Sequence, residues 1–137
     1  MGPAATRRVL IAEDDRAIQM IVAEYLRAEG FAVDVANNGA EALALAHRTP
    51  PAIAVVDMFM PVMDGHQFLA AWSQDSSLNR VPVIVVSAAA DLREVAIRYA
   101  PGTVRATLSK PFDLDALGAL VEGTLRGPAP MERGAPG

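Results

Sequence analysis

Short apolar runs alternate with segments of helical periodicity along the sequence, and this alternation limits the possible folds more than any other feature. The runs are typical of buried strands, and the segments between them repeat apolar side chains every three or four positions. Such an alternation predicts a parallel sheet, because each right-handed crossover returns its helix to a face of that sheet. We therefore predict a single-domain α/β fold with five strands and five helices in three layers. The expected strands are 9–12, 31–36, 52–56, 81–86 and 104–108.

The helices are expected in the intervals between and after these strands. Asn38 and Asp113 are suitable N-caps, and Glu41 follows Asn38 at the spacing of a capping box. A turn is expected at Pro101–Gly102, and the mixed polarity of the last strand indicates an edge position. The expected helices are about 18–29, 38–48, 66–79, 92–99 and 114–125.

Composition and length set the broad class. With 137 residues there is room for one domain, expected over 7–126, with a disordered leader at 1–6 and a Pro/Gly-rich tail or truncated linker at 127–137. No apolar stretch approaches the ~18 residues that cross a membrane, and nothing at the start reads as a signal peptide. Cysteine is absent, which excludes thiolate chemistry and is compatible with a cytoplasmic location. A net charge of −4 argues against direct nucleic-acid binding.

Chemically active side chains stand at the ends of four apolar runs. Glu13 and Asp14 follow the first run, Asp57 follows the third, Ser87 the fourth and Lys110 the fifth. The carboxyl ends of parallel strands face one crevice, so these side chains are expected to meet there. Each also has a purely structural interpretation: a turn or helix cap, acids that complement a helix dipole, or a surface lysine.

Four segments resemble the receiver domain of two-component response regulators. They are Val9–Asp15, Asp57–Gly65, Val85–Ala88 and Ser109–Phe112. They occur in the order and at the spacing of that family, and the resemblance extends over about residues 7–126. It implies a flavodoxin-like (βα)5 sandwich with strand order 2-1-3-4-5.

The resemblance also implies roles for the residues at the strand ends. Asp57 is the expected phosphoacceptor, which a carboxylate performs by attacking a phosphoryl group in line. Mg²⁺ is the implied cofactor, with Asp14, Asp57 and the backbone carbonyl of Phe59 as ligands and Glu13 acting through water. Lys110 would pair with a phosphoryl oxygen, and its bond to the following proline is expected to be cis.

Switching and phosphate loss depend on positions where the sequence departs from the family pattern. Ser87 is expected to bond the phosphoryl group, and its movement is normally coupled to an aromatic residue that is replaced here by Thr107. Tyr99 is a possible substitute but is more simply explained by packing. Family members that lose phosphate rapidly have polar side chains where this chain has Phe59 and Ala89, so we expect slow autodephosphorylation.

The resulting hypothesis is a phosphoacceptor domain that catalyses its own modification and is not a conventional enzyme. Its implied partners are a sensor histidine kinase or histidine phosphotransfer protein and an unidentified output partner, without membrane contact. The domain is expected to be a monomer or a weak, phosphorylation-linked dimer. Two alternatives stay open: an interaction module that signals without phosphate, suggested by Thr107, and a Mg²⁺-dependent phosphohydrolase, which would need a general acid where Phe59 stands.

Overall fold

The computed structural model describes residues 7–99 and 102–127, and of residues 89–91 it describes only the backbone. Five strands alternate with five helices, as the sequence predicts. The strands are β1 (Arg8–Ala12), β2 (Ala32–Ala36), β3 (Ile53–Asp57), β4 (Val83–Ser87) and β5 (Val104–Ser109). The helices are α1 (Arg16–Ala28), α2 (Gly39–Arg48), α3 (Gly65–Gln74), α4 (Ala89–Tyr99) and α5 (Leu114–Arg126).

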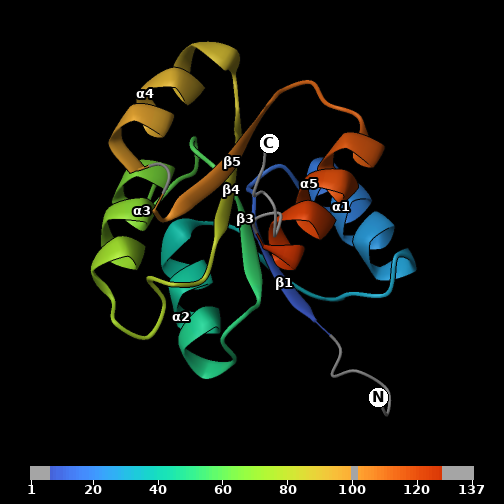
Figure 1. Cartoon of the computed structure of the whole chain (residues 1–137), viewed down its shortest axis with the longest axis horizontal. Coiled ribbons are helices and arrows are strands. Elements are labelled where there is room, and N and C mark those ends of the chain that lie inside the picture. Colours follow the sequence, from blue (N-terminus) through green and yellow to red (C-terminus); the bar gives the residue numbers. More distant parts are fainter. Residues whose placement is uncertain (1–6, 100–101, 128–137) are drawn as a thin grey trace, which may run out of the picture.

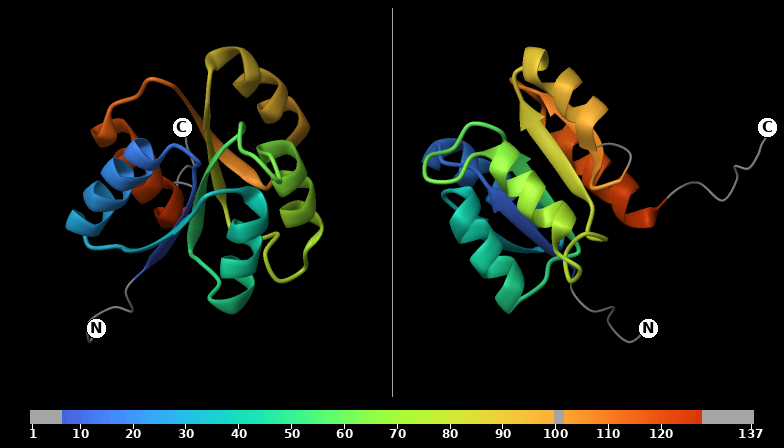
Figure 2. Two further views of the ribbon diagram at one scale, coloured as in Figure 1. Left: turned by 180° about the vertical axis from the view of Figure 1, so that it is seen from behind. Right: turned by 90° about the vertical axis from the view of Figure 1, so that its left-hand side faces the viewer.

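The strands form one parallel sheet in the order β2-β1-β3-β4-β5, so the predicted topology is confirmed. Helices α1 and α5 cover one face of the sheet, and α2, α3 and α4 cover the other (Figure 1). Views from behind and from the side show the same three layers (Figure 2). The central strands β3 and β4 are buried along their whole length, whereas β5 lies at an edge and mixes buried and exposed residues.

Each face of the sheet has its own hydrophobic core, because successive side chains of a strand point to opposite faces. On β1, Val9 and Ile11 join the core beneath α1 and α5, whereas Leu10 and Ala12 join the other core. Trp72 of α3 is fully buried in the second core. Burial on both faces fixes the register of the central strands, and thereby the positions at which their last residues emerge.

The third helix ends at Gln74, five residues before the predicted end. Asp75 ends it, because its side chain accepts hydrogen bonds from the backbone N–H and the hydroxyl of Ser77. The chain then turns so that the N–H groups of Leu78 and Asn79 donate to the carbonyl of Asp75. This turn buries Leu78 completely, which a continued polar helix would not do.

The predicted helix caps are confirmed in part. Asn38 caps α2 by accepting from the N–H of Glu41, but the Glu41 side chain bonds Asn37 in place of Asn38, so the full capping box is absent at this helix. Asp113 occupies the N-cap of α5, and its side chain makes no capping bond to the described residues.

Other expectations fall outside the described residues. Pro101 of the predicted turn, the leader 1–6 and residues 128–137 lie outside the described residues, so the predicted domain boundaries stay predictions. Among the helices described, none is long and apolar enough to cross a membrane.

Candidate functional site

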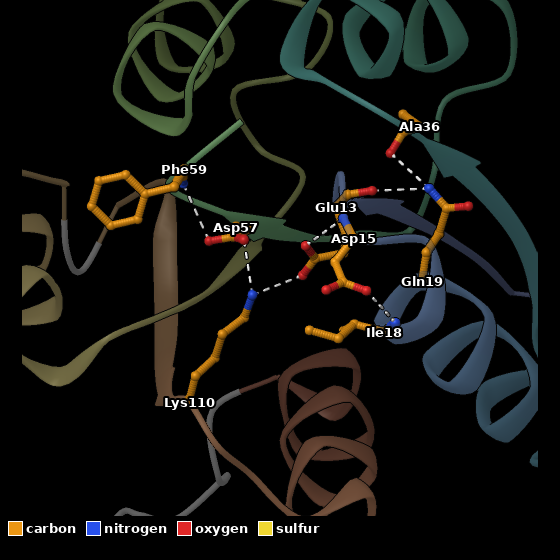
Figure 3. A network of polar contacts seen from close by, with 8 residues as sticks. All are labelled: Glu13, Asp15, Ile18, Gln19, Ala36, Asp57, Phe59 and Lys110. Atoms are coloured by element: carbon orange, nitrogen blue, oxygen red, sulfur yellow. Dashed lines mark hydrogen bonds and ion pairs between the residues drawn. The ribbon is translucent and has the colours of Figure 1, made fainter. Parts of the chain in front are cut away.

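The carboxyl ends of β1, β3, β4 and β5 meet at one open pocket of about 470 Å³. Its polar network is drawn in Figure 3. The predicted convergence of strand ends is therefore present in the structure, and Asp57 and Lys110 point toward one another across it. The pocket is lined by Glu13, Asp14, Asp15, Ile18, Asp57, Phe59, Ser87, Ala88 and Lys110.

Asp57 is the last residue of β3, and only 6% of its surface is exposed. One carboxylate oxygen accepts from the backbone N–H of Phe59 at 3.2 Å, and the other accepts from Lys110 at 2.8 Å. The chain folds back directly after this position: the N–H of Gly65 donates to the carbonyl of Met58, and a Cβ on Gly65 would lie 2.5 Å from Met58 Cα. A glycine is therefore required there to keep the loop close to Asp57.

Lys110 follows β5 and bonds two acids at once. Its ammonium group lies 2.8 Å from Asp57 and 3.0 Å from Glu13. The predicted cis bond to Pro111 is confirmed. Burial alone would lower the pKa of Lys110, but the hydrogen bonds and negative charge of Asp57 and Glu13 outweigh it and raise that pKa above its ordinary value. The lysine is therefore held fully cationic in the pocket.

Three carboxylates gather beside this lysine. One oxygen from each of Glu13, Asp14 and Asp57 lies within 4.8 Å of the others. Hard divalent cations prefer oxygen ligands of this kind, so the donor set fits Mg²⁺. Burial raises the pKa of Glu13, and the charge of Asp57 adds to this, despite hydrogen bonds from Asp15 and Lys110. An added cation would relieve that unfavourable charge.

Asp15 and Ser87 also line the pocket. Asp15 is the N-cap of α1, where its side chain accepts from the N–H of Ile18, so it has the capping role that acids favour. Ser87 ends β4 and is buried, and its hydroxyl finds no hydrogen-bond partner among the described residues. A buried hydroxyl without a partner is costly, so it is available to a group that enters the pocket.

Thr107 is the one predicted residue that the pocket does not include. It lies on β5 opposite Val85 of β4 and is partly buried. Tyr99 packs against the core beneath α3 and α4, as expected for an ordinary packing residue. The side chain of Ala89 lies outside the described residues.

The structure adds two features that were not predicted from the sequence. Gln19 is buried, and its side-chain amide donates to the backbone carbonyl of Glu13. Its sequence signal was a polar residue inside the apolar stripe of α1. The second feature is an apolar groove of about 460 Å³ beside Lys110, lined also by Ile18, Ile21, Val22, Pro111, Phe112 and Leu114.

The sequence model of the response regulator receiver domain matches residues 9–122. The chain belongs to this family. It is 38% identical over 120 residues to the transcriptional regulatory protein PdtaR of Mycobacterium tuberculosis, and 31% identical over 118 residues to the probable transcriptional regulator ycf29 of Pyropia yezoensis. These matches cover 87% and 86% of this chain but 57% and 53% of those proteins, so the receiver domain spans a little over half of each relative.

Solved structures agree with the fold of this receiver domain. A sensor protein from Polaromonas sp. JS666 is similar with a TM-score of 0.80 and 31% identity, over 89% of this chain and 98% of that one. A CheY-like receiver domain protein from Methanospirillum hungatei is similar with a TM-score of 0.80 and 25% identity, over 89% and 95%. The flavodoxin-like fold predicted from the sequence is therefore confirmed.

Proposed function

We propose that this receiver domain accepts a phosphoryl group on Asp57 from a phosphohistidine of a sensor kinase or phosphotransfer protein. The observation that carries the proposal is the arrangement of Lys110 between Asp57 and Glu13, with Asp14 in the same cluster. A nucleophilic carboxylate, a fixed cation and additional acids for a divalent ion are the parts that phosphoryl transfer to a carboxylate requires.

In the proposed reaction, a carboxylate oxygen of Asp57 attacks phosphorus as the phosphorus–nitrogen bond of the donor breaks. The imidazole leaves with the bonding electron pair and takes up a proton. Lys110, already 2.8 Å from the carboxylate, moves its hydrogen bond to a phosphoryl oxygen and neutralises developing charge. Asp14, Asp57 and the carbonyl of Phe59 would hold Mg²⁺, with Glu13 acting through water. The ion would offset the negative charge of acid and phosphate.

The buried hydroxyl of Ser87 is proposed to bond the phosphoryl group once it is attached. Its lack of a partner in the described residues supports this role. We propose that Ser87 and Thr107 on adjacent strands carry the resulting change toward the output partner, although Thr107 lacks the aromatic ring that is usual in the family. A smaller population shift than that of an aromatic switch is therefore expected.

The donor protein is proposed to bind across the apolar groove beside Lys110. Met20 and Ile21 of α1 are more than half exposed, and Ile21 lines the groove. Exposed apolar patches of this kind mark protein interfaces. A donor seated there would bring its phosphohistidine to the mouth of the Asp57 pocket, because Lys110 borders both cavities.

Phosphate loss is proposed to be slow. Phe59 lines the pocket two positions after Asp57, and its hydrocarbon ring cannot orient an attacking water molecule. The same absence of a second acid at this position disfavours the phosphohydrolase alternative.

The proposal is tested by incubating the protein with acetyl phosphate and Mg²⁺ and recording ³¹P NMR spectra. An acyl phosphate signal that disappears with hydroxylamine is expected. If the protein carries no acyl phosphate with either acetyl phosphate or a phosphohistidine protein, the phosphate-independent interaction module becomes the better explanation. Sustained release of inorganic phosphate from small esters would instead favour a phosphohydrolase.

A further inference from the structure

We infer that Gln19 is a positioning residue that holds Glu13, and with it the end of β1, in the geometry of the acid pocket. The inference rests on the proposed Mg²⁺ and phosphoryl role of that pocket. Gln19 itself reaches neither Asp57 nor Lys110 (Figure 3). Its side-chain amide bonds the carbonyl groups of Glu13 and Ala36 and the side chain of Asn37.

The side-chain amide of Gln19 connects three segments of the chain. Its nitrogen lies 2.9 Å from the carbonyl oxygen of Glu13, 3.0 Å from Oδ1 of Asn37 and 3.4 Å from the carbonyl oxygen of Ala36. All three partners are oxygen atoms, so the amide must present its N–H groups to them. The hydrogen bonds of Gln19 therefore connect α1 to the ends of both β1 and β2.

Gln19 is buried, so the loss of its hydrogen bonds would be energetically costly. Only 6% of the surface of Gln19 is exposed, because this polar residue lies on the apolar face of α1 next to Val22 and Ala23. A buried polar side chain without hydrogen bonds carries an uncompensated desolvation cost, and so do the carbonyl groups that it would otherwise bond. The amide therefore has one favourable arrangement, in which it donates a hydrogen bond to the carbonyl of Glu13.

Glu13 is held at each of its polar groups. Its N–H donates to the carbonyl of Ala36 at 3.0 Å, and its carboxylate accepts from Lys110 and from the N–H of Asp15 at 3.0 and 3.1 Å. Gln19 supplies the remaining bond, to the Glu13 carbonyl. This carbonyl belongs to the peptide group that joins Glu13 to Asp14, so Gln19 fixes the peptide plane between the two acids.

The test compares Gln19→Met with the wild type in the full chain. Methionine keeps the length and burial of the side chain but removes both N–H donors. Mg²⁺ affinity is measured by calorimetric titration with MgCl₂, and the ¹⁵N resonance of the Asp14 amide is recorded, since it reports the hydrogen bond to the preceding carbonyl. Val121→Ala is the control, because it removes buried methyl groups of α5 and no polar contact.

Gln19→Met is expected to weaken Mg²⁺ binding about 10-fold, as is usual when a group that orients a metal ligand is lost, and to shift the Asp14 resonance. Gln19→Glu is expected to weaken it further, because it places an oxygen against three oxygens. Val121→Ala is expected to leave both readouts unchanged.

Equal Mg²⁺ affinity in wild type and Gln19→Met would overturn the inference, and so would an equal loss in Val121→Ala, which would reduce Gln19 to general packing. If the wild type itself failed to bind Mg²⁺, the proposed function would be at fault. The Asp14 resonance would then decide the inference alone: a shift in Gln19→Met would support it, and an unchanged resonance would overturn it.

Discussion

Lys110 donates to Oδ2 of Asp57 and to Oε1 of Glu13, so a single cation is shared by the two buried acids of the pocket. Glu13 follows β1, Asp57 ends β3, and the lysine follows β5, with β4 between β3 and β5. Lys110 therefore joins strands that are not all neighbours in the sheet, and its loss should affect both chemistry and stability.

Lys110→Met is expected to slow phosphorylation by acetyl phosphate about 100-fold, because a fixed donor to the transferring group is removed. It is also expected to lower the free energy of unfolding in Mg²⁺-free buffer by about 1–3 kcal/mol, because two buried acids lose a charged partner. Intact mass over time and urea unfolding measure the two effects. A variant that is phosphorylated at the wild-type rate would contradict the assigned role.

The titration of Lys110 gives a pH test, because it is the only lysine in the chain and yields one ¹³C-labelled lysine signal. Its pKa is expected above the ordinary 10.5, owing to the hydrogen bonds and charge of Asp57 and Glu13. A raised pKa stabilises the fold below the unfolded-state pKa, and this contribution disappears as pH rises through the folded-state value. Asp57→Asn should lower the pKa of Lys110. A wild-type value at or below 10.5 would contradict the ion pairs described.

Mg²⁺ is expected to stabilise the protein, because the ion would bind the folded acid cluster and not the unfolded chain. At ten times its dissociation constant, the gain in the free energy of unfolding should be about 1.4 kcal/mol. Asp14→Asn should abolish most of that gain. Asp15→Asn is the matched control, since asparagine is an equally good N-cap and Asp15 has a capping role. Equal Mg²⁺ responses of the two variants in thermal unfolding would remove Asp14 from the ligand set.

A substitution in the groove between α1 and the segment after β5 is expected to affect phosphoryl transfer from a protein donor and not from a small-molecule donor. Ile21→Asp is expected to slow transfer from a phosphohistidine protein about 10-fold, equal to ~1.4 kcal/mol, while phosphorylation by acetyl phosphate is unchanged. Ile97→Asp on α4 is the control, because Ile97 is also exposed, at 78% against 53% for Ile21. The groove would be excluded as the donor surface if both variants accepted phosphate from the protein donor at the same rate.

The sequence was sufficient for the order of elements and for the meeting of the strand-end residues, because both follow from alternation and parallel pairing. It did not predict hydrogen bonds for side chains that have several possible partners in the folded protein. The end of α3 depends on the bonds between Asp75 and Ser77, and Glu41 bonds Asn37 in place of the expected partner. The burial of Gln19 could not be predicted, because its partners at the ends of β1 and β2 come together only in the folded protein.

The most direct test of the account is the mass of the protein during incubation with acetyl phosphate and Mg²⁺, alongside Asp57→Asn. The wild type is expected to gain one phosphoryl group, the variant none, and the added mass is expected to decay over minutes or longer after donor removal. Equal labelling of the wild type and Asp57→Asn, or no labelling of either by acetyl phosphate and a phosphohistidine protein, would contradict Asp57 as the phosphoacceptor. Decay within seconds would contradict only the slow loss assigned to the Phe59 position.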